Sequence, residues 1–407
     1  MKIAVIGGGA AGLMAAGEAA SNGADTTLFE KNDRLGVKLR ITGKGRCNVT
    51  NNCDRQTFFD NVVSNPRFLY SAYSEFTTAD TMSFFENLGV PLKTERGNRV
   101  FPVSDKASDI VDALARFCEQ GGVKVKRERV KKLSHDTDFT VITNGGEYKF
   151  DKVIIATGGL SYPRTGSTGD GYKFARDLGH NITKTSPSLV PLICEGTLCG
   201  QCQGLSLKNV TLYVHDNEKD KTVYSELGEM IFTENGVSGP LVLSASSHMT
   251  DIYEGKYKLY IDLKPALDRQ TLDKRLLRDF SENKNKDVVN SFSALLPSKL
   301  IAPFIKLTGI PRDKKVNSIT VSERAAIVEY LKKLPLDVIA AEKIDEAIIT
   351  RGGVDTKQIE PKTMQSKLVK GLYFAGEIID CDAYTGGFNL QIAFCTGYAA
   401  GHHASQI

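Results

Sequence analysis

The chain has 407 residues, of which 41% are hydrophobic and 25% are charged, and its formal net charge is +4. This length exceeds the roughly 250–300 residues at which a single core stops growing, so we expect two or three lobes. The composition excludes fibrous and disordered classes, and no apolar run approaches the roughly 18 residues that a membrane-spanning helix needs.

The first predicted strand, residues 3–6, starts two residues into the chain and leaves no room for a secretory signal sequence. Eight cysteines are scattered over the chain, a usage that favours reduced thiols over a disulfide framework. Together these features predict a cytoplasmic protein.

Residues 7–12 follow this strand with the sequence Gly-Gly-Gly-Ala-Ala-Gly, and an apolar helical stretch over residues 13–20 comes next. This order of strand, G-x-G-x-x-G turn and helix is typical of a dinucleotide-binding site. The first glycine permits the tight turn, the second lets a pyrophosphate approach the backbone, and the third lets helix and strand pack closely.

A second predicted strand, residues 26–29, ends on Glu30, which lies 18 residues after Gly12. A carboxylate at this place would accept hydrogen bonds from the hydroxyls of an unphosphorylated ribose. The N-terminal motif therefore predicts a dinucleotide site, and by itself it leaves both FAD and NAD open.

Ser104 is placed to cap a helix whose Ile110, Leu114 and Phe117 share one face, and a basic strand is predicted over residues 123–130. Residues 152–159 then form a buried-strand pattern that ends in Ala-Thr-Gly-Gly. This resembles a segment of two-part FAD domains, and the resemblance implies that it passes under the cofactor.

The middle of the chain changes character after residue 187. The predicted strands cover residues 205–214, 221–232 and 257–263, and the predicted helices cover residues 267–280, 297–308 and 321–333. The last helix opens with Thr320 and Glu323 as a capping box.

Near the C-terminus, residues 371–377 form another short strand with a glycine stop, Asp380 follows, and residues 386–391 open a final helix. The N-terminus of that helix would stabilise the anion that a flavin becomes on reduction. These segments favour FAD over NAD. Because they return in the last 40 residues, the FAD domain must be discontinuous.

Residues 42–51, Thr-Gly-Lys-Gly-Arg-Cys-Asn-Val-Thr-Asn, and the C-terminal motif from Gly376 to Gln391 resemble the BaiN-like family of flavoproteins, which also includes an aminoacetone oxidase. The resemblance runs nearly end to end. It implies an α/β fold in which a two-part Rossmann-type FAD-binding domain is interrupted by an inserted β-rich, barrel-like subdomain and a small helical subdomain.

On this basis we expect the FAD-binding domain at residues 1–187 and 347–407, the β-rich subdomain at 188–266 and 334–346, and the helical subdomain at 267–333. The resemblance and the motifs together imply non-covalent FAD binding by a set of residues along both halves. These are Gly7, Gly9, Ala10, Ala11, Gly12, Glu30, Lys31, Lys38, Gly45, Arg46, Cys47, Asn48, Val130, Ala156, Thr157, Gly158, Gly159, Gly376, Glu377, Asp380, Gly387, Phe388, Asn389 and Leu390.

The sequence leaves the catalytic residues open. Phe101, Tyr162, Tyr384 and Cys381 stand beside the cofactor motifs and are candidates for lining the substrate pocket. Cys381 departs from the family pattern, in which a small or aliphatic residue is expected at this position.

Cys194, Cys199 and Cys202 have the C-x4-C-x2-C spacing of some iron–sulfur proteins, and the last two alone form a C-x-x-C pair. No suitable fourth cysteine follows, and no histidine lies nearby to complete a zinc site. We therefore predict free thiols and no metal.

The resulting hypothesis is an FAD-dependent oxidoreductase that passes hydride between a small organic substrate and flavin N5. Nicotinamide, oxygen or another acceptor would be the redox partner. If NADH or NADPH reduces the flavin, it must dock transiently, because no second G-x-G-x-x-G is present. The family resemblance permits both amine oxidation and the reduction of an unsaturated ring. The sequence indicates neither the oligomeric state nor a membrane partner.

An alternative is an FAD-bound RNA-modifying or RNA-binding protein. Residues 264–333 contain 15 Lys and Arg against 8 Asp and Glu, a local net charge of +7 that could hold a phosphate backbone. Against this, basic and acidic residues alternate over 273–287, a pattern that favours a solvated face and makes nucleic acid the weaker hypothesis. A structural or regulatory FAD-bound protein is the third hypothesis.

Overall fold

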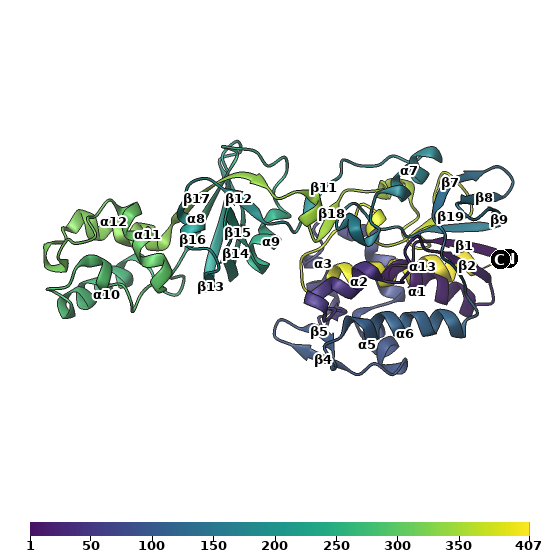
Figure 1. Ribbon diagram of the computed structural model, residues 1–407, viewed down its shortest axis with the longest axis horizontal. Helices are drawn as coiled ribbons and strands as arrows, with labels where there is room; N and C mark the ends of the chain where they lie inside the picture. Colours follow the sequence, from purple (N-terminus) through teal and green to yellow (C-terminus); the bar gives the residue numbers. More distant parts are fainter. Residues whose placement is uncertain (407) are drawn as a thin grey trace. The chain divides into compact units, whose positions relative to one another are not determined.

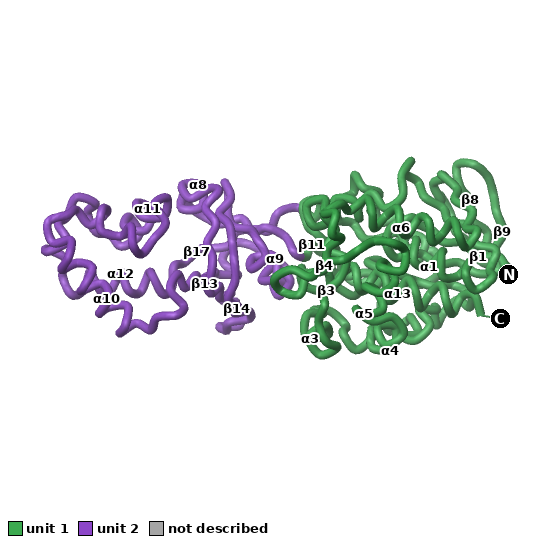
Figure 2. Tube along the Cα trace, turned by 90° about the horizontal axis from the view of Figure 1, so that it is seen from below, with its two compact units in different colours: residues 1–188, 344–407 green, residues 189–343 purple. Residues whose placement is uncertain are grey.

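The computed structural model describes residues 1–406, and the chain divides into two compact units (Figure 2). Unit 1 comprises Met1–Ser188 and Ile344–Ile407, and unit 2 comprises Leu189–Lys343. The cofactor motifs from both ends of the sequence lie in unit 1. The barrel and the helices, which were predicted to form two subdomains, lie together in unit 2.

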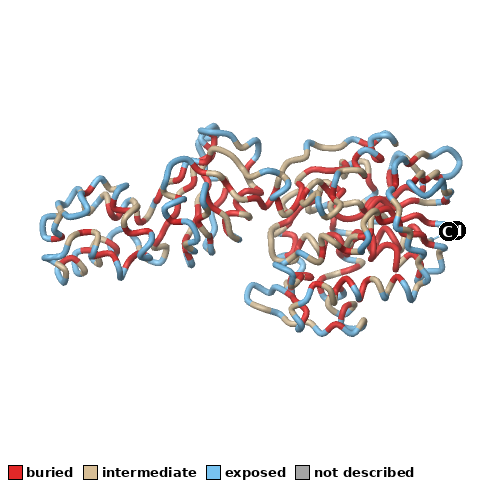
Figure 3. The backbone as a smooth tube through the Cα atoms, in the orientation of Figure 1, coloured by how far each residue is buried: buried red, intermediate tan, exposed pale blue. Residues whose placement is uncertain are grey.

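A five-stranded parallel sheet forms the centre of unit 1. Its order is β19 (Leu372–Phe374), β10 (Lys152–Ile155), β1 (Lys2–Ile6), β2 (Asp25–Phe29) and β6 (Lys124–Lys126). The inner strands are buried at every residue after the first, because both faces of a parallel sheet are covered. Ile3, Ala4 and Val5 are fully buried, and Figure 3 shows buried backbone concentrated along these strands.

The N-terminal helix α1 (Ala10–Ser21) packs along the C-terminal helix α13 (Phe388–Ser405), as Figure 1 shows. Their backbones approach so closely that a Cβ at Gly397 would lie 2.6 Å from the carbonyl oxygen of Ala11. This contact joins the first and last segments of the chain within one domain, as the return of the cofactor motifs predicts.

Unit 1 carries further elements around the parallel sheet. Its helices are α2 (Val37–Ile41), α3 (Arg55–Asp60), α4 (Tyr70–Glu75), α5 (Thr78–Asn87), α6 (Ala107–Gln120) and α7 (Asp170–Asp177). Its smaller sheets pair β3 (Thr50–Asn51) and β4 (Leu92–Glu95) with β5 (Arg99–Pro102), β8 (Phe139–Thr143) with β7 (Val130–His135) and β9 (Glu147–Phe150), and β11 (Ser186–Ser188) with β18 (Ile349–Arg351).

Two expectations about this region are wrong. The single strand expected over residues 123–130 is two strands, because β6 pairs in parallel with β2 whereas Val130 already pairs antiparallel with Thr143. Ser104 does not cap α6, which begins at Ala107 after Lys106. The Ser104 hydroxyl instead donates to Asp109 at 2.6 Å and accepts from the backbone N–H of Lys106 at 3.3 Å.

Unit 2 contains a closed six-stranded barrel. The order around it is β12 (Leu192–Cys194), β15 (Gly236–Ser238), β14 (Lys221–Phe232), β13 (Ser206–Asp216), β16 (Tyr257–Asp262) and β17 (Leu334–Ala341). The strands expected over 205–214, 221–232 and 257–263 are confirmed as β13, β14 and β16. Closure leaves the barrel without a free sheet edge.

The helices of unit 2 are α8 (Leu198–Gln201), α9 (Pro240–Ser246), α10 (Arg269–Glu282), α11 (Ser298–Thr308) and α12 (Val321–Lys332). The capping box of α12 is confirmed, since Thr320 Oγ1 accepts from the Glu323 N–H at 3.2 Å and the Glu323 carboxylate accepts from the Thr320 N–H at 2.8 Å. The predicted fold class is thereby confirmed. None of the helices within residues 1–406 is long and apolar enough to cross a membrane.

Candidate functional site

The carboxyl ends of four parallel strands meet at one edge of the sheet in unit 1. β1 stands between β2, which follows it in the chain, and β10, which comes much later, so the strand order reverses at β1. Ligands of open α/β sheets bind in the crevice outside the strand ends at such a point. The predicted cofactor residues Gly7, Glu30, Ala156 and Gly376 lie at or next to these strand ends.

The three glycines of the N-terminal turn have different surroundings. Gly7 has φ of 109°, and a Cβ there would lie 2.5 Å from the carbonyl oxygen of Ala156. A Cβ at Gly12 would lie 1.8 Å from the carbonyl oxygen of Gly7. Gly9 has ordinary extended backbone angles, and a Cβ there would meet no protein atom within 4 Å. Gly7 and Gly12 thus serve internal packing, whereas Gly9 faces open space.

The N-terminus of α1 is open to an anion. Gly9 is its N-cap residue, no side chain caps it, and its first turn contains no acidic residue. The first N–H groups of a helix have no intrahelical partner and carry a partial positive charge, so this end is suited to a phosphate. Ala10 and Ala11 place only small side chains beside it.

Glu30 is buried at the end of β2 and already accepts two hydrogen bonds from the backbone. The N–H of Gly8 donates to Oε2 at 2.7 Å, and the N–H of Asn32 donates to Oε1 at 2.8 Å. A carboxylate offers about four lone-pair positions, so acceptor capacity is left for ribose hydroxyls. Glu30 therefore also holds the glycine turn, a role that the sequence does not indicate.

Replacing Glu30 with glutamine should separate these two roles. The amide oxygen can still accept from Gly8, but the charge is lost, and charge-assisted hydrogen bonds are worth about 1.5–3 kcal/mol. We expect the dissociation constant for FAD to rise by about tenfold, as measured by quenching of flavin fluorescence. Glu30→Ala would also leave the Gly8 N–H unpaired and destabilise the apoprotein, so glutamine is the informative change. Unchanged FAD affinity in Glu30→Gln would exclude a ribose contact by this carboxylate.

In the loop over residues 42–51, the side chain of Arg46 contacts other residues of the protein. Its guanidinium forms an ion pair with Glu95, and its Nε donates to Asp105 Oδ1 at 2.7 Å. The central carbon of the guanidinium lies 4.1 Å from the centroid of the Phe101 ring. The side chain is thus occupied on the protein, and only the Arg46 backbone is left to contact a cofactor. Phe101 is buried beneath it.

The next two residues of this loop, Cys47 and Asn48, each have a buried polar group. Burial raises the pKa of the Cys47 thiol to about 12, so this thiol stays protonated at neutral pH. The side-chain oxygen of Asn48 is buried and has no hydrogen-bond partner among the described residues. A buried acceptor without a partner is costly, and a bound ligand with a donor group would satisfy it.

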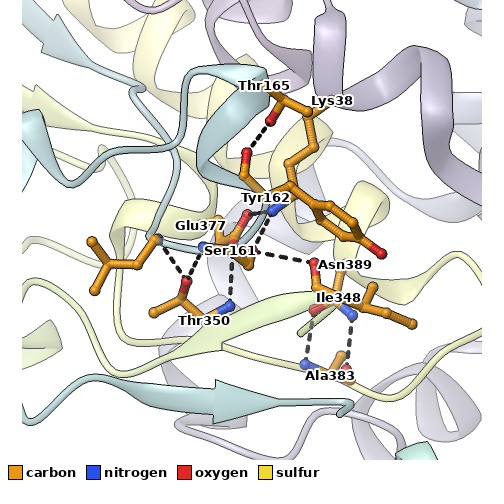
Figure 4. A network of polar contacts seen from close by, with 10 residues as sticks. Lys38, Ser161, Tyr162, Thr165, Ile348, Thr350, Glu377, Ala383 and Asn389 are labelled. Atoms are coloured by element: carbon orange, nitrogen blue, oxygen red, sulfur yellow. Dashed lines mark hydrogen bonds and ion pairs between the residues drawn. The ribbon is translucent and has the colours of Figure 1, made fainter. Parts of the chain in front are cut away.

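A polar network joins segments that lie far apart in the sequence (Figure 4). The Lys38 ammonium donates to Ser161 Oγ and to Glu377 Oε2, both at 2.6 Å. The other oxygen of Glu377 accepts from the Thr350 N–H at 2.8 Å and from the Ser161 hydroxyl at 2.9 Å. The predicted residues Lys38 and Glu377 are therefore brought together. Ser161 and Thr350 were not predicted, although Ser161 follows closely on the Ala-Thr-Gly-Gly segment.

Tyr162 is the next residue after Ser161 of this network, and its backbone conformation is unusual. Its φ of 52° lies in the left-handed region, where a bulky residue is a genuine outlier. Thr165 holds this conformation by donating its N–H and its hydroxyl to the Tyr162 carbonyl oxygen at 2.8 and 2.7 Å. Burial raises the pKa of the phenol, and the Lys38 ammonium lies 5.9 Å from the ring centroid.

The side chain of Asn389 forms hydrogen bonds with the backbone of the loop that precedes α13. Its side-chain oxygen accepts from the Ala383 N–H at 3.0 Å, and its amide donates to the carbonyl oxygens of Ala383 and Tyr384 at 2.8 and 3.2 Å. These bonds use three of the four hydrogen-bonding positions of the side chain. The N-terminus of α13 has no side-chain cap and no acid in its first turn, so its backbone N–H groups remain for a cofactor.

Gly387, the N-cap of α13, has φ of 100°, and a Cβ there would lie 2.4 Å from the Thr50 carbonyl oxygen. This glycine is thus already required by packing on β3.

The remaining candidates lie around the same sheet edge. The Lys31 ammonium binds Asp170 at 2.8 Å and Thr168 at 2.5 Å. Burial raises the pKa of the Asp380 carboxyl and raises that of the Cys381 thiol well above its ordinary value. Thr157 Oγ1 has no hydrogen-bond partner among the described residues and lies against Gly171 of α7.

Cys194, Cys199 and Cys202 are all buried in the core of unit 2 as free thiols. Burial raises the pKa of Cys202 to about 11, and its Sγ donates to the carbonyl oxygen of Lys299 at 3.8 Å. Within residues 1–406, no group of three or more His, Cys, Asp or Glu is arranged to hold a metal ion.

The residues at this edge fit FAD. Open space above Gly9, the uncapped N-terminus of α1, the spare acceptor capacity of Glu30 and the unpaired oxygen of Asn48 are separate features that one dinucleotide would use. Residues 1–403 match the family described as HI0933-like protein Rossmann domain. The chain belongs to this family.

As a member of the HI0933-like family, the protein is an enzyme of the flavin-dependent oxidoreductase class, and the resemblance seen in its motifs is confirmed. It is 31% identical to a ribosomal RNA dihydrouridine synthase of Escherichia coli over 397 residues, which cover 97% of this chain and 96% of that protein. It is 29% identical to a 3-dehydro-bile acid delta(4,6)-reductase of Clostridium scindens over 412 residues, which cover 100% of this chain and 99% of that protein.

A solved structure shares the HI0933-like fold at low identity. The 3-ketosteroid-delta4-(5alpha)-dehydrogenase of Rhodococcus jostii RHA1, in complex with 4-androstene-3,17-dione, matches with a TM-score of 0.54 at 16% identity. The match covers 100% of this chain and 96% of that chain. It shows that the two proteins share an overall fold.

Proposed function

We propose that this enzyme uses FAD to reduce a carbon–carbon double bond conjugated to a carbonyl group, and that its substrate is a uridine in ribosomal RNA. The full-length similarity to two kinds of reductase carries this proposal. Dihydrouridine is uridine reduced at C5–C6, a bond conjugated to the C4 carbonyl. The delta(4,6) double bonds of a 3-dehydro bile acid are likewise conjugated to its C3 carbonyl. The relatives' names thus differ in substrate and agree in bond type.

Reduced FAD, when bound, would supply the hydride for such a reduction. We assign its binding to the predicted residues at the sheet edge, with backbone contacts from Arg46 and the first turn of α13. The diphosphate would lie at the N-terminus of α1, and Glu30 would hold the adenosine ribose.

The carbon next to the carbonyl must take up a proton in the same reaction. We assign this proton to the Tyr162 hydroxyl. Its raised pKa keeps the phenol protonated at neutral pH, and its left-handed backbone is the kind of outlier that clusters at functional sites. Water would restore the proton to the tyrosinate left behind. Cys381 is less suited because it is almost fully buried.

The proposal is tested with purified holoprotein under anaerobic conditions. NADH and NADPH are each tried as donors, first alone by following the bleaching of flavin absorbance, then with ribosomal RNA transcribed in vitro. Nucleoside mass spectrometry should detect dihydrouridine, with a gain of two mass units over uridine, only when both donor and holoprotein are present.

A 3-oxo steroid acid with conjugated double bonds serves as the second substrate, because the bile-acid reductase is similar over the whole chain. Reduction of the steroid without dihydrouridine formation would transfer the assignment to a small-molecule reductase. Failure with both substrates while the flavin is reduced would exclude the proposed bond type.

A further inference from the structure

A hollow on unit 2 gathers three basic side chains. It has a volume of about 630 Å³ and lies between the end of α8, the helix α11 and the loop that follows α11. Lys299, Lys306 and Arg312 line it, together with apolar and small residues and Gln201, and its lining contains no acidic residue. The three basic residues are exposed.

The local sequence explains why these side chains converge. Lys299 and Lys306 are seven residues apart, which places them on one face of α11, about 10 Å apart along its axis. The helix ends before Gly309, and the chain turns back so that Arg312 reaches the same hollow.

The wall of the hollow is fixed by contacts between α8 and α11. Pro303 cannot donate to the carbonyl oxygen of Lys299, four residues earlier, and the Cys202 thiol takes that place at 3.8 Å. The Lys299 ammonium donates to the Gln203 carbonyl oxygen at 2.6 Å. This bond is to a neutral group, so the charge of Lys299 is not compensated.

Other cations of the same unit are neutralised within the protein. Lys314 binds Glu323 at 2.6 Å, Lys315 binds Asp287 at 2.7 Å, and Arg324 binds Asp273 at 2.6 Å. No such ion pair involves Lys299, Lys306 or Arg312 among the described residues, although Asp313 is next in sequence to Arg312. The local excess of positive charge in 264–333 is thus uncompensated at this hollow.

We infer that the hollow binds the phosphate backbone of an RNA substrate; the identity of that RNA rests on the function proposed above. Phosphate contacts position a nucleic acid without reading its sequence, and Lys and Arg supply them. Lys299 and Lys306 are spaced to contact different phosphates, with Arg312 beside them. The mixed face of α10 is not part of this site, because Arg269 pairs with Glu329 and Arg278 with Asp279.

The test measures binding of oxidised holoprotein, without a reductant, to a fluorescein-labelled fragment of ribosomal RNA by anisotropy over 50–200 mM salt. The variant is the triple change Lys299→Gln, Lys306→Gln and Arg312→Gln. Its matched control is Arg269→Gln, Arg278→Gln and Lys315→Gln, which removes the same charge from exposed residues that are paired within the protein.

The variant should bind at least tenfold more weakly at 50 mM salt, and the slope of log affinity against log salt should fall by about two, since each lost phosphate contact removes about 0.7. The control should stay within about threefold of the parent. Both proteins should keep the thermal unfolding midpoint of the parent and full FAD content.

Equal binding by variant and parent would overturn the inference, as would a parent that shows no RNA binding. Competition by polyglutamate as effective as that by RNA would also overturn it, in favour of an acidic protein partner. Because no turnover is involved, these results are independent of dihydrouridine formation. RNA that binds through the hollow without being reduced would contradict the proposed reaction and leave this site in place.

Discussion

Tyr162→Phe is expected to slow reduction of the substrate double bond by about 100-fold or more while FAD stays bound. The change removes one oxygen atom and keeps the ring, and a positioned general acid contributes about 10²–10⁴ in rate. Flavin reduction by the nicotinamide donor should keep its rate, because that step does not need this proton. Stopped-flow measurement of the two half-reactions separates them.

Tyr384→Phe is the matched control, since Tyr384 is the other tyrosine beside a cofactor motif. It should remain within a few-fold of the parent. The pH profile gives a further readout, because a donor must be protonated and burial raises the pKa of Tyr162. Activity that depends on this phenol should therefore persist through neutral pH and fall only above the ordinary range of tyrosine. A slower flavin reduction in Tyr162→Phe, or a larger defect in Tyr384→Phe, would remove Tyr162 from the proposed role.

The sheet edge could be predicted from sequence because its determinants are local. The glycine turn, the strand before it and Glu30 all lie within the first 30 residues, and their residue types and spacing form one recognisable motif. Three of the six barrel strands, β13, β14 and β16, and the helices α10, α11 and α12 were likewise predictable from their periodicity and from the capping box at Thr320, whereas the short elements β12, β15, α8 and α9 and the strand β17 were not predicted. Their closure into one compact unit is a property of long-range pairing that a local pattern does not contain.

The sequence could not predict which side chains form hydrogen bonds and ion pairs with one another. Lys38 and Glu377 are separated by 339 positions, and Arg46 meets two acids from a different segment of the chain. A motif predicts that these residues are close to the cofactor, but hydrogen-bond geometry decides whether a side chain or only its backbone is free. For Arg46, whose guanidinium is paired with Glu95 and Asp105, the structure leaves the backbone for contact with a cofactor.

The two errors in unit 1 have a related origin. Ser104 has a residue type suited to capping, yet the turn of residues 102–105 delays the helix until Ala107. The run of basic residues after 123 continues past the end of β6, so composition alone does not reveal that the chain changes sheets before Val130. In both cases the residue type was informative and the boundary was set by tertiary structure.

Gly9→Ala should weaken FAD binding by about 100-fold and leave the apoprotein as stable as the parent. The new methyl group meets no protein atom within 4 Å, and the φ of −86° suits alanine, so nothing in the chain itself resists the change. The same methyl group would occupy the space through which a diphosphate reaches the first N–H groups of α1. Losing two charge-assisted hydrogen bonds, at about 1.5–3 kcal/mol each, accounts for an effect of this size.

Gly12→Ala provides the contrast, because its methyl group would lie 1.8 Å from the Gly7 carbonyl oxygen. This variant should lose stability even without FAD, whereas Gly9→Ala should lose only affinity. Thermal unfolding of the two apoproteins and titration of each with FAD distinguish the two effects. The diphosphate has to pass close to Gly9 if it is bound by α1 at all. Parental FAD affinity in Gly9→Ala would therefore show that the diphosphate is held elsewhere, and the assignment of the N-terminal glycine turn as the phosphate site would be lost.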